Sequence, residues 1–195
     1  SQAVAKLQSG KTEDALRQLS QVTATQPGNA EAFGWLAIAH SRIRQSDLAQ
    51  RAIQRAIELS PANAGFYMTS ANIQQDLGNL EAAAGLLQNA IRLNPDFAEA
   101  YNNLGIVLSD LRRVDEAQSA FAEAIRLKPK YARAHANLAA VQIRMLKFQE
   151  ALISAQQAAT IQPDYAHAHH LTGSAYSLLG NPKAERLLSQ LPVQE

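Results

Sequence analysis

The 195-residue chain contains no cysteine, which excludes disulfides and thiolate metal ligands. It has no apolar run near the roughly 20 residues that a membrane-spanning helix needs, so we expect no membrane insertion. The first residues lack the apolar stretch of a secretory signal, but the chain starts within a repeat, as shown below. We therefore leave the compartment open, with the bacterial cytoplasm favoured and the periplasm retained as an alternative.

The chain also lacks an excess of charge of either sign. Its 18 basic and 17 acidic residues are mixed along the sequence and leave a formal net charge of +1. No basic block is present to neutralise a phosphate backbone, so we expect no nucleic-acid partner. The 47% apolar content, with 18% charged residues, is that of a folded chain rather than a disordered one.

Proline recurs with a fixed period. Five prolines lie 34 residues apart, at Pro27, Pro61, Pro95, Pro129 and Pro163. A period of this length indicates a stacked helical repeat. If each proline takes position 32, the complete repeats are 30–63, 64–97, 98–131 and 132–165. A partial repeat covers 1–29, and a second one with a C-terminal capping helix covers 166–195, so we expect a single array over 1–195.

Small residues recur at the positions where neighbouring helices approach closely. Position 8 holds Ala37, Ala71, Gly105, Ala139 and Gly173, and position 20 holds Ala15, Ala49, Ala83, Ala117 and Ala151. Larger residues such as Leu87 and Phe121 occupy position 24, so small and large side chains alternate in a pattern that lets helices interlock.

Each repeat is predicted to contain two helices of about 14 residues. The first helix should end near Gly78, Arg112 or Gly180, because glycine suits a left-handed C-terminal cap, and the second should end just before its proline. We predict N-caps for the second helices at Asp47, Asn79 and Asp115. Asp96 and Asp164 are predicted to cap first helices.

The third complete repeat, AEAYNNLGIVLSDLRRVDEAQSAFAEAIRLKPKY, resembles the tetratricopeptide repeat family, and the resemblance extends over essentially the whole chain. The resemblance implies an all-α fold, a right-handed α-α superhelix (solenoid) of antiparallel helix pairs. First helices of the family line a concave groove that usually receives a peptide or an extended segment. The family's aromatic residue at position 4 is replaced by His135 and His169, which implies looser or more polar packing near the C-terminal end.

The resemblance implies that the groove is lined by residues on one face of each first helix. The candidate peptide-binding residues are Trp35, Ile38, Met68, Asn72, Asn102, Asn103, Ile106, Asn137, Arg144 and His170. An asparagine amide offers both a donor and an acceptor, which matches the N–H and C=O groups of an extended peptide. Trp35, Ile38, Met68 and Ile106 offer apolar anchors. For Trp35, a ligand contact and a role in core packing both remain open.

Two specialised versions of the family can be compared with these residues. Repeats that resemble chaperone-binding co-chaperones grip a terminal carboxylate with lysine at position 5, which is absent here. The inward asparagine ladder of repeats joined to sugar transferases is half present, since Asn103 and Asn137 occupy position 6 but Trp35, Thr69 and Leu171 interrupt it.

The segment AHAHH at 166–170 comes nearest to a metal site, because His167 and His170 share a helical face. Two ligands are too few, so we expect no metal and no cofactor. We find no phosphate-binding glycine loop and no nucleophile motif, so we assign no catalytic residues and expect no enzyme activity.

We therefore predict a protein-interaction scaffold that binds an extended peptide or partner segment. The alternative is an accessory domain that positions substrates for a larger glycosyltransferase or sulfotransferase. Self-association through the incomplete first repeat is a third hypothesis. An alanine- and glutamine-rich array without cysteine favours a bacterial source.

Overall fold

The computed structural model describes residues 2–180. The chain divides into two compact units, unit 1 (Ser1–Pro95) and unit 2 (Asp96–Glu195), which are described separately below. In the described part every regular element is an α-helix, which confirms the predicted all-α fold class. Residues 2–180 contain no helix that is both long enough and apolar enough to cross a bilayer.

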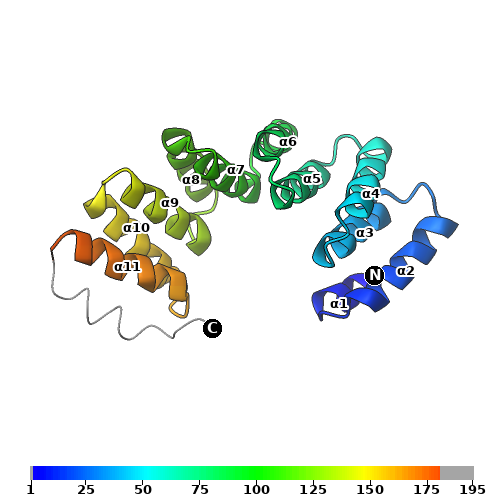
Figure 1. Cartoon of the computed structure of the whole chain (residues 1–195), viewed down its shortest axis with the longest axis horizontal. Coiled ribbons are helices and arrows are strands. Elements are labelled where there is room, and N and C mark those ends of the chain that lie inside the picture. Colours follow the sequence, from blue (N-terminus) through cyan, green and yellow to red (C-terminus); the bar gives the residue numbers. More distant parts are fainter. Residues whose placement is uncertain (1, 181–195) are drawn as a thin grey trace. The chain divides into compact units, whose positions relative to one another are not determined.

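Unit 1 consists of three successive helix pairs (Figure 1). The helices are α1 (Gln2–Gln8) with α2 (Thr12–Thr25), α3 (Ala30–Arg42) with α4 (Ser46–Leu59), and α5 (Ala64–Asp76) with α6 (Leu80–Leu93). Each complete pair has a first helix of 13 residues and a second of 14, as the sequence predicts. The main packing contacts among the described helices join helices one or two places apart along the chain.

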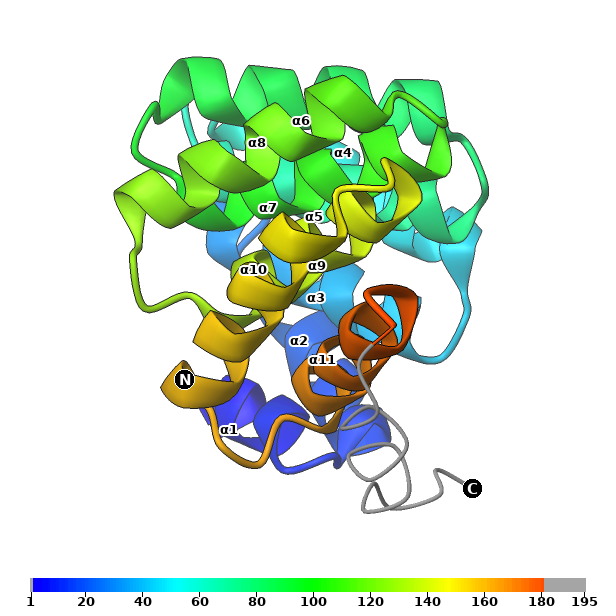
Figure 2. The ribbon, with the colours of Figure 1, turned by 90° about the vertical axis from the view of Figure 1, so that its left-hand side faces the viewer.

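Unit 2 repeats this arrangement. Its described helices are α7 (Ala98–Asp110) with α8 (Val114–Leu127), α9 (Ala132–Arg144) with α10 (Phe148–Ile161), and α11 (Ala166–Leu178). Figure 2 shows α9 and α10 running side by side in this unit. The capping helix predicted after Pro182 lies outside the described residues.

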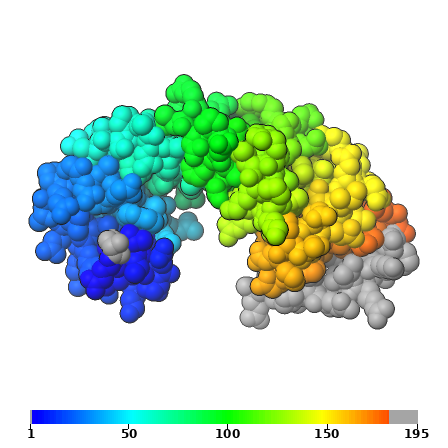
Figure 3. Space-filling view, turned by 180° about the vertical axis from the view of Figure 1, so that it is seen from behind, coloured from blue at the N-terminus to red at the C-terminus, as the bar shows by residue number. Residues whose placement is uncertain are grey.

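The recurring small residues form the contacts within each unit. Position 20 is fully buried in the five repeats where the structure describes it, with 0% exposure at Ala15, Ala49, Ala83, Ala117 and Ala151. Figure 3 shows the outer surface of these helices with their side chains in place. Gly105 shows how closely the helices approach, because a Cβ atom there would lie 2.5 Å from Cε1 of Phe121. The alternation of small and large residues is therefore confirmed.

The turn that follows each first helix contains one residue with a left-handed backbone. Gly10, Gly78 and Gly180 adopt this conformation, as expected for glycine. The same place in the other repeats is taken by Arg44, Arg112 and Leu146, with φ of 58°, 65° and 60°. The repeat therefore imposes this backbone whether or not the residue is glycine.

The predicted caps at Asp47 and Asp115 are wrong. The N-caps of α4 and α8 are Gln45 and Arg113, which directly follow the left-handed residue of the turn. The turn thus sets the helix start two residues earlier than the aspartate. Asp47 and Asp115 lie in the first turn instead, where a carboxylate complements the helix dipole.

The predicted caps at Asp96 and Asp164 are also wrong, because Phe97 and Tyr165 hold the N-cap positions of α7 and α11. Asn79 does occupy the N-cap of α6, but its side-chain amide donates to Oε1 of Gln74 at 2.9 Å instead of capping.

Two asparagines that we did not predict act as true caps in unit 1. Oδ1 of Asn29 accepts from the Ala32 amide, and Oδ1 of Asn63 accepts from the Gly65 amide, both at 3.0 Å. Both belong to the loops that follow the repeated prolines.

The two histidines at position 4 make the same contact in successive repeats of unit 2. Nε2 of His135 lies 3.0 Å from the carbonyl oxygen of Pro129, and Nε2 of His169 lies 2.7 Å from that of Pro163. A carbonyl oxygen only accepts, so Nε2 carries the proton and donates. The polar packing expected at these positions is therefore confirmed.

Candidate functional site

An amide chain joins the first helices α7 and α9 in unit 2. Nδ2 of Asn137 donates to Oδ1 of Asn102 at 2.9 Å, and Nδ2 of Asn102 donates to Oδ1 of Asn103 at 3.3 Å. Asn102 is only 3% exposed, whereas Asn103 and Asn137 are partly exposed. Asn102 therefore lies behind the other two and fixes their orientation, while Asn103 and Asn137 bring amide groups to the surface.

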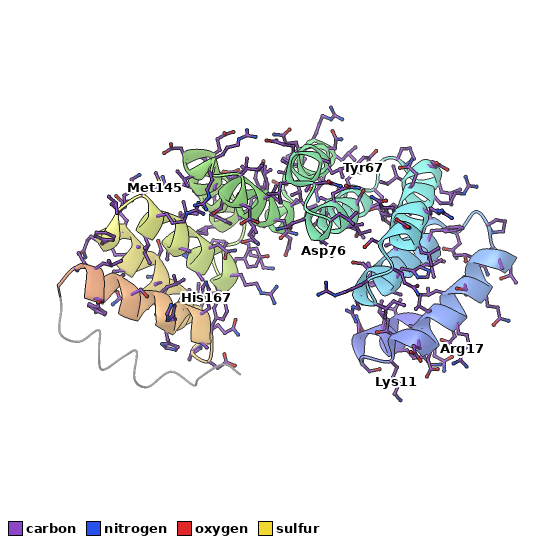
Figure 4. The ribbon with its side chains drawn as sticks, in the orientation of Figure 1. Lys11, Arg17, Tyr67, Asp76, Met145 and His167 are labelled. Atoms are coloured by element: carbon purple, nitrogen blue, oxygen red, sulfur yellow. The ribbon has the colours of Figure 1, made fainter. Side chains whose placement is uncertain are left out.

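Arg144 is held at the end of α9 by the preceding first helix. Its Nη1 donates to Oγ of Ser109 at 2.6 Å and to the Ser109 carbonyl at 3.1 Å. Unit 1 contains a related contact, since Oγ of Ser41 donates to Oδ2 of Asp76 at 3.3 Å at the end of α5 (Figure 4). The last turns of neighbouring first helices are thus linked in both units, and Arg144 presents its charge from a fixed position.

The start of α7 carries an ion pair. Nζ of Lys128 lies 2.8 Å from Oε1 of Glu99 and 4.9 Å from the centre of the Tyr131 ring. The hydrogen bond from Lys128 lowers the pKa of Glu99, and the same bond raises the pKa of Lys128. This edge of the first-helix face is therefore locally neutral at pH 7.

Among the described residues, the histidines of α11 have no third metal-binding side chain beside them. His167, on α11 in Figure 4, meets the Tyr165 ring edge-on with ring centres 6.0 Å apart. Partial burial lowers the pKa of His167, and the charge of nearby His170 adds to this effect. Residues 2–180 contain no group of three histidine, cysteine or acidic side chains placed to hold a metal ion.

The candidate residues of unit 1 lie on α3 and α5. Trp35 and Ile38 are partly buried and pack against the hydrophobic core of the unit. Trp35 also lines a pocket of about 640 Å³ between α1, α2 and α3, so its core and surface roles coexist. On α5, Met68 is partly buried and Asn72 is exposed.

The structure connects some of the predicted residues and leaves others apart. Asn102, Asn103 and Asn137 form one network, and Ile106 and His170 lie on α7 and α11 of the same unit, partly buried and exposed respectively. Sequence reasoning missed the part that the second helix α2 plays, through Gln18 and Val22, in the pocket beside Trp35. The family resemblance assigns the groove walls to first helices, and the repeat pattern contains no signal that points to α2.

Models of known protein families match the helical repeat of this chain. A family described as "TPR repeat" matches residues 71–111, and two families described as "Tetratricopeptide repeat" match residues 6–73 and 98–131. No curated protein matches the sequence.

Several solved structures share this fold at low sequence identity. PilF of Pseudomonas aeruginosa is 20% identical over 97% of this chain and 86% of its own, with a TM-score of 0.87. MamA is 24% identical over 84% of this chain and 96% of its own, with a TM-score of 0.72. YrrB, described as a TPR protein with an unusual peptide-binding site, is 20% identical over 88% of this chain and 89% of its own, with a TM-score of 0.69. Identities at this level establish the fold alone.

Proposed function

Because the chain belongs to the tetratricopeptide repeat family, we propose that it is a protein-interaction scaffold that holds an extended segment of a partner along its first helices. We assign it no catalytic role and no nucleic-acid partner. YrrB supports this proposal as a protein of the same fold that has a peptide-binding site.

The observation that carries the proposal is the amide chain of Asn102, Asn103 and Asn137. The side-chain amide of the buried Asn102 donates a hydrogen bond to Asn103 and accepts one from Asn137. These two bonds hold both partly exposed asparagines in one orientation. Oriented amides lose little side-chain freedom when they bind, so they recognise a peptide backbone at a lower entropic cost than mobile ones. Ile106, on the same helix as Asn103, is an apolar contact for side chains of the bound segment.

The test is the double substitution Asn103→Ala with Asn137→Ala. A partner is first identified by affinity capture from the source organism, and its bound segment is then titrated calorimetrically as a synthetic peptide. We expect the double variant to lose roughly tenfold or more in affinity, because two hydrogen bonds to the backbone are removed.

The matched control is Gln157→Ala, which removes an exposed amide from the second helix α10 of the same unit. It should leave the affinity unchanged. If the double variant keeps its far-ultraviolet circular dichroism and binds as tightly as the unsubstituted chain, the groove is not the binding surface.

A second candidate function is substrate positioning for a larger enzyme of the glycosyltransferase or sulfotransferase kind. Asn103 and Asn137 at equivalent positions of successive repeats favour it, since a repeated inward asparagine suits many different substrate backbones. Sequence-independent affinity for unrelated extended peptides distinguishes this candidate from a dedicated scaffold, which should prefer one partner.

A further inference from the structure

The pocket between α1, α2 and α3 in unit 1 is lined by both apolar and polar side chains. Its volume of about 640 Å³ lies in the range of pockets that hold a small ligand or a large side chain. Val4, Leu19, Val22 and Trp35 supply apolar surface, and Gln18 and Glu31 are among the polar residues that line it. Lys11 and Arg17, labelled in Figure 4, precede the part of α2 that lines this pocket.

The side chain of Gln18 contains a buried acceptor without a hydrogen-bond donor among the described residues. Its Oε1 is buried and accepts no hydrogen bond from any described residue. Buried acceptors are nearly always paired, because their contact with water has been lost. The terminal amide of glutamine turns easily about its last torsion, so this oxygen can be aimed at a donor that enters the pocket.

Glu31 gives the pocket its charge. It is the one ionisable side chain among the residues that line the pocket in the described part of the chain. Nδ2 of Asn63 donates to its Oε1 at 3.2 Å, which orients the carboxylate without neutralising it. The pocket therefore combines an aromatic ring, an unmet acceptor and a negative charge, and it favours a ligand that is flat, positively charged and rich in donors.

We propose that this pocket binds an arginine side chain of a protein segment, and this inference rests on the proposed function because that segment is the one held along the first helices. A guanidinium carries five donors in a fixed plane, so it can donate to Glu31 and Gln18 together while lying against an indole. Lysine has one compact head group and matches this arrangement less well. Trp35 is then a specificity residue as well as a core residue.

Trp35 is the sole tryptophan of the chain, so its fluorescence reports binding in this pocket. The probe is the blocked tripeptide acetyl-Ala-Arg-Ala-amide, titrated against the 195-residue chain at constant ionic strength while the emission of Trp35 is followed. We expect the emission of Trp35 to change saturably with the arginine peptide. The same peptide with citrulline in place of arginine keeps the shape but loses the charge, and it should bind at least about tenfold more weakly. The same peptide with glutamate in place of arginine should cause no change.

The substitutions Glu31→Gln and Gln18→Leu should each weaken the binding of the arginine peptide by roughly tenfold, since the first removes the negative charge of the pocket and the second removes its buried acceptor. Glu58→Gln, which removes an exposed acid on α4 outside the pocket, should have no effect. Thermal unfolding of each variant shows that the unit remains folded.

Four results would overturn the proposal. The first is an unchanged Trp35 emission with the arginine peptide, and the second is equal binding of the citrulline or glutamate peptide. The third is an emission change that depends on protein concentration and accompanies a dimer in sedimentation velocity, which would assign the pocket to a second copy of the chain. If partner binding is lost with Asn103→Ala and Asn137→Ala but is unaffected by Glu31→Gln, this proposal fails while the proposed function stands.

Discussion

Leu146 holds a backbone conformation that is costly for leucine. Its φ of 60° is in the left-handed region, and its side chain is 74% exposed. A side chain with a Cβ loses about 1–2 kcal/mol in that region, whereas glycine adopts it freely. Leu146→Gly should therefore stabilise the protein by about 0.5–1 kcal/mol, after allowance for the greater freedom of glycine in the unfolded chain.

Urea unfolding measures this gain, and Gly78→Ala is the reverse experiment. Gly78 holds the equivalent place with φ of 80°, and a Cβ there meets no atom within 4 Å. Any loss at Gly78 thus reports backbone strain and not a steric clash. A Leu146→Gly variant that is less stable than the original would show that the leucine side chain contributes more than its backbone costs.

Glu99 makes part of the stability of unit 2 dependent on pH. Lys128 lowers the pKa of Glu99 in the folded protein, so the favourable contribution is fully present above the ordinary glutamate pKa in the unfolded chain. It is lost as the pH falls through the lower folded pKa. The substitution Lys128→Gln should raise the pKa of Glu99 in a carbon-detected NMR titration. It should also remove the part of the acid dependence of stability that Glu99 supplies. Lys130→Gln, at another exposed lysine, should do neither.

Within a helix pair, the side chain at position 24 limits the size of the residue that fits at position 8. Gly105 on α7 lies against Phe121 on α8, whereas unit 1 places Ala71 and Leu87 at the same two positions. Gly105→Ala should cost about 1–3 kcal/mol, because the new methyl group would overlap the Phe121 ring. Adding Phe121→Leu should restore much of this loss, since the pair then matches the one in α5 and α6.

A double-mutant cycle in urea measures the coupling between these two positions. Gly85→Ala is the control, because its new methyl group meets no atom within 4 Å and alanine favours a helix. It should be neutral or stabilising. Additive effects of Gly105→Ala and Phe121→Leu would show that the two side chains do not compete for the same space.

The helix pairs were predictable because they depend on local periodicity. Two alanines seven residues apart in the second helix of each complete repeat, and a proline every 34 residues, leave one arrangement in which each apolar face is covered. The caps at Asp47 and Asp115 were mispredicted because capping depends on where the preceding turn ends, and the left-handed residues Arg44 and Arg112 have no glycine signature. The burial of Asn102 and the unmet acceptor of Gln18 depend on contacts between helices, which periodicity does not encode.

For the molecule as a whole, packing that is concentrated between nearby helices implies local stability. In unit 1, α2 packs against α3, and neither α1 nor α2 packs extensively against α6. The stability of such an array is a sum of repeat and nearest-neighbour contributions, so a loss in one repeat spreads only to its neighbours. Leu19→Ala, which empties a core site on α2, should cost about 2–5 kcal/mol locally.

Hydrogen exchange detected by mass spectrometry resolves this effect along the chain. With Leu19→Ala, amides of α2 and α3 should exchange faster, whereas those of α6 should keep the rates of the unsubstituted protein under native conditions. Leu87→Ala is the converse variant, because it leaves a cavity in the core beside α6. It should leave the exchange rates of the α2 amides unchanged. If either substitution accelerated exchange equally in α2 and α6, unit 1 would unfold as one cooperative block, and the pocket beside Trp35 would depend on packing well beyond the three helices that form it.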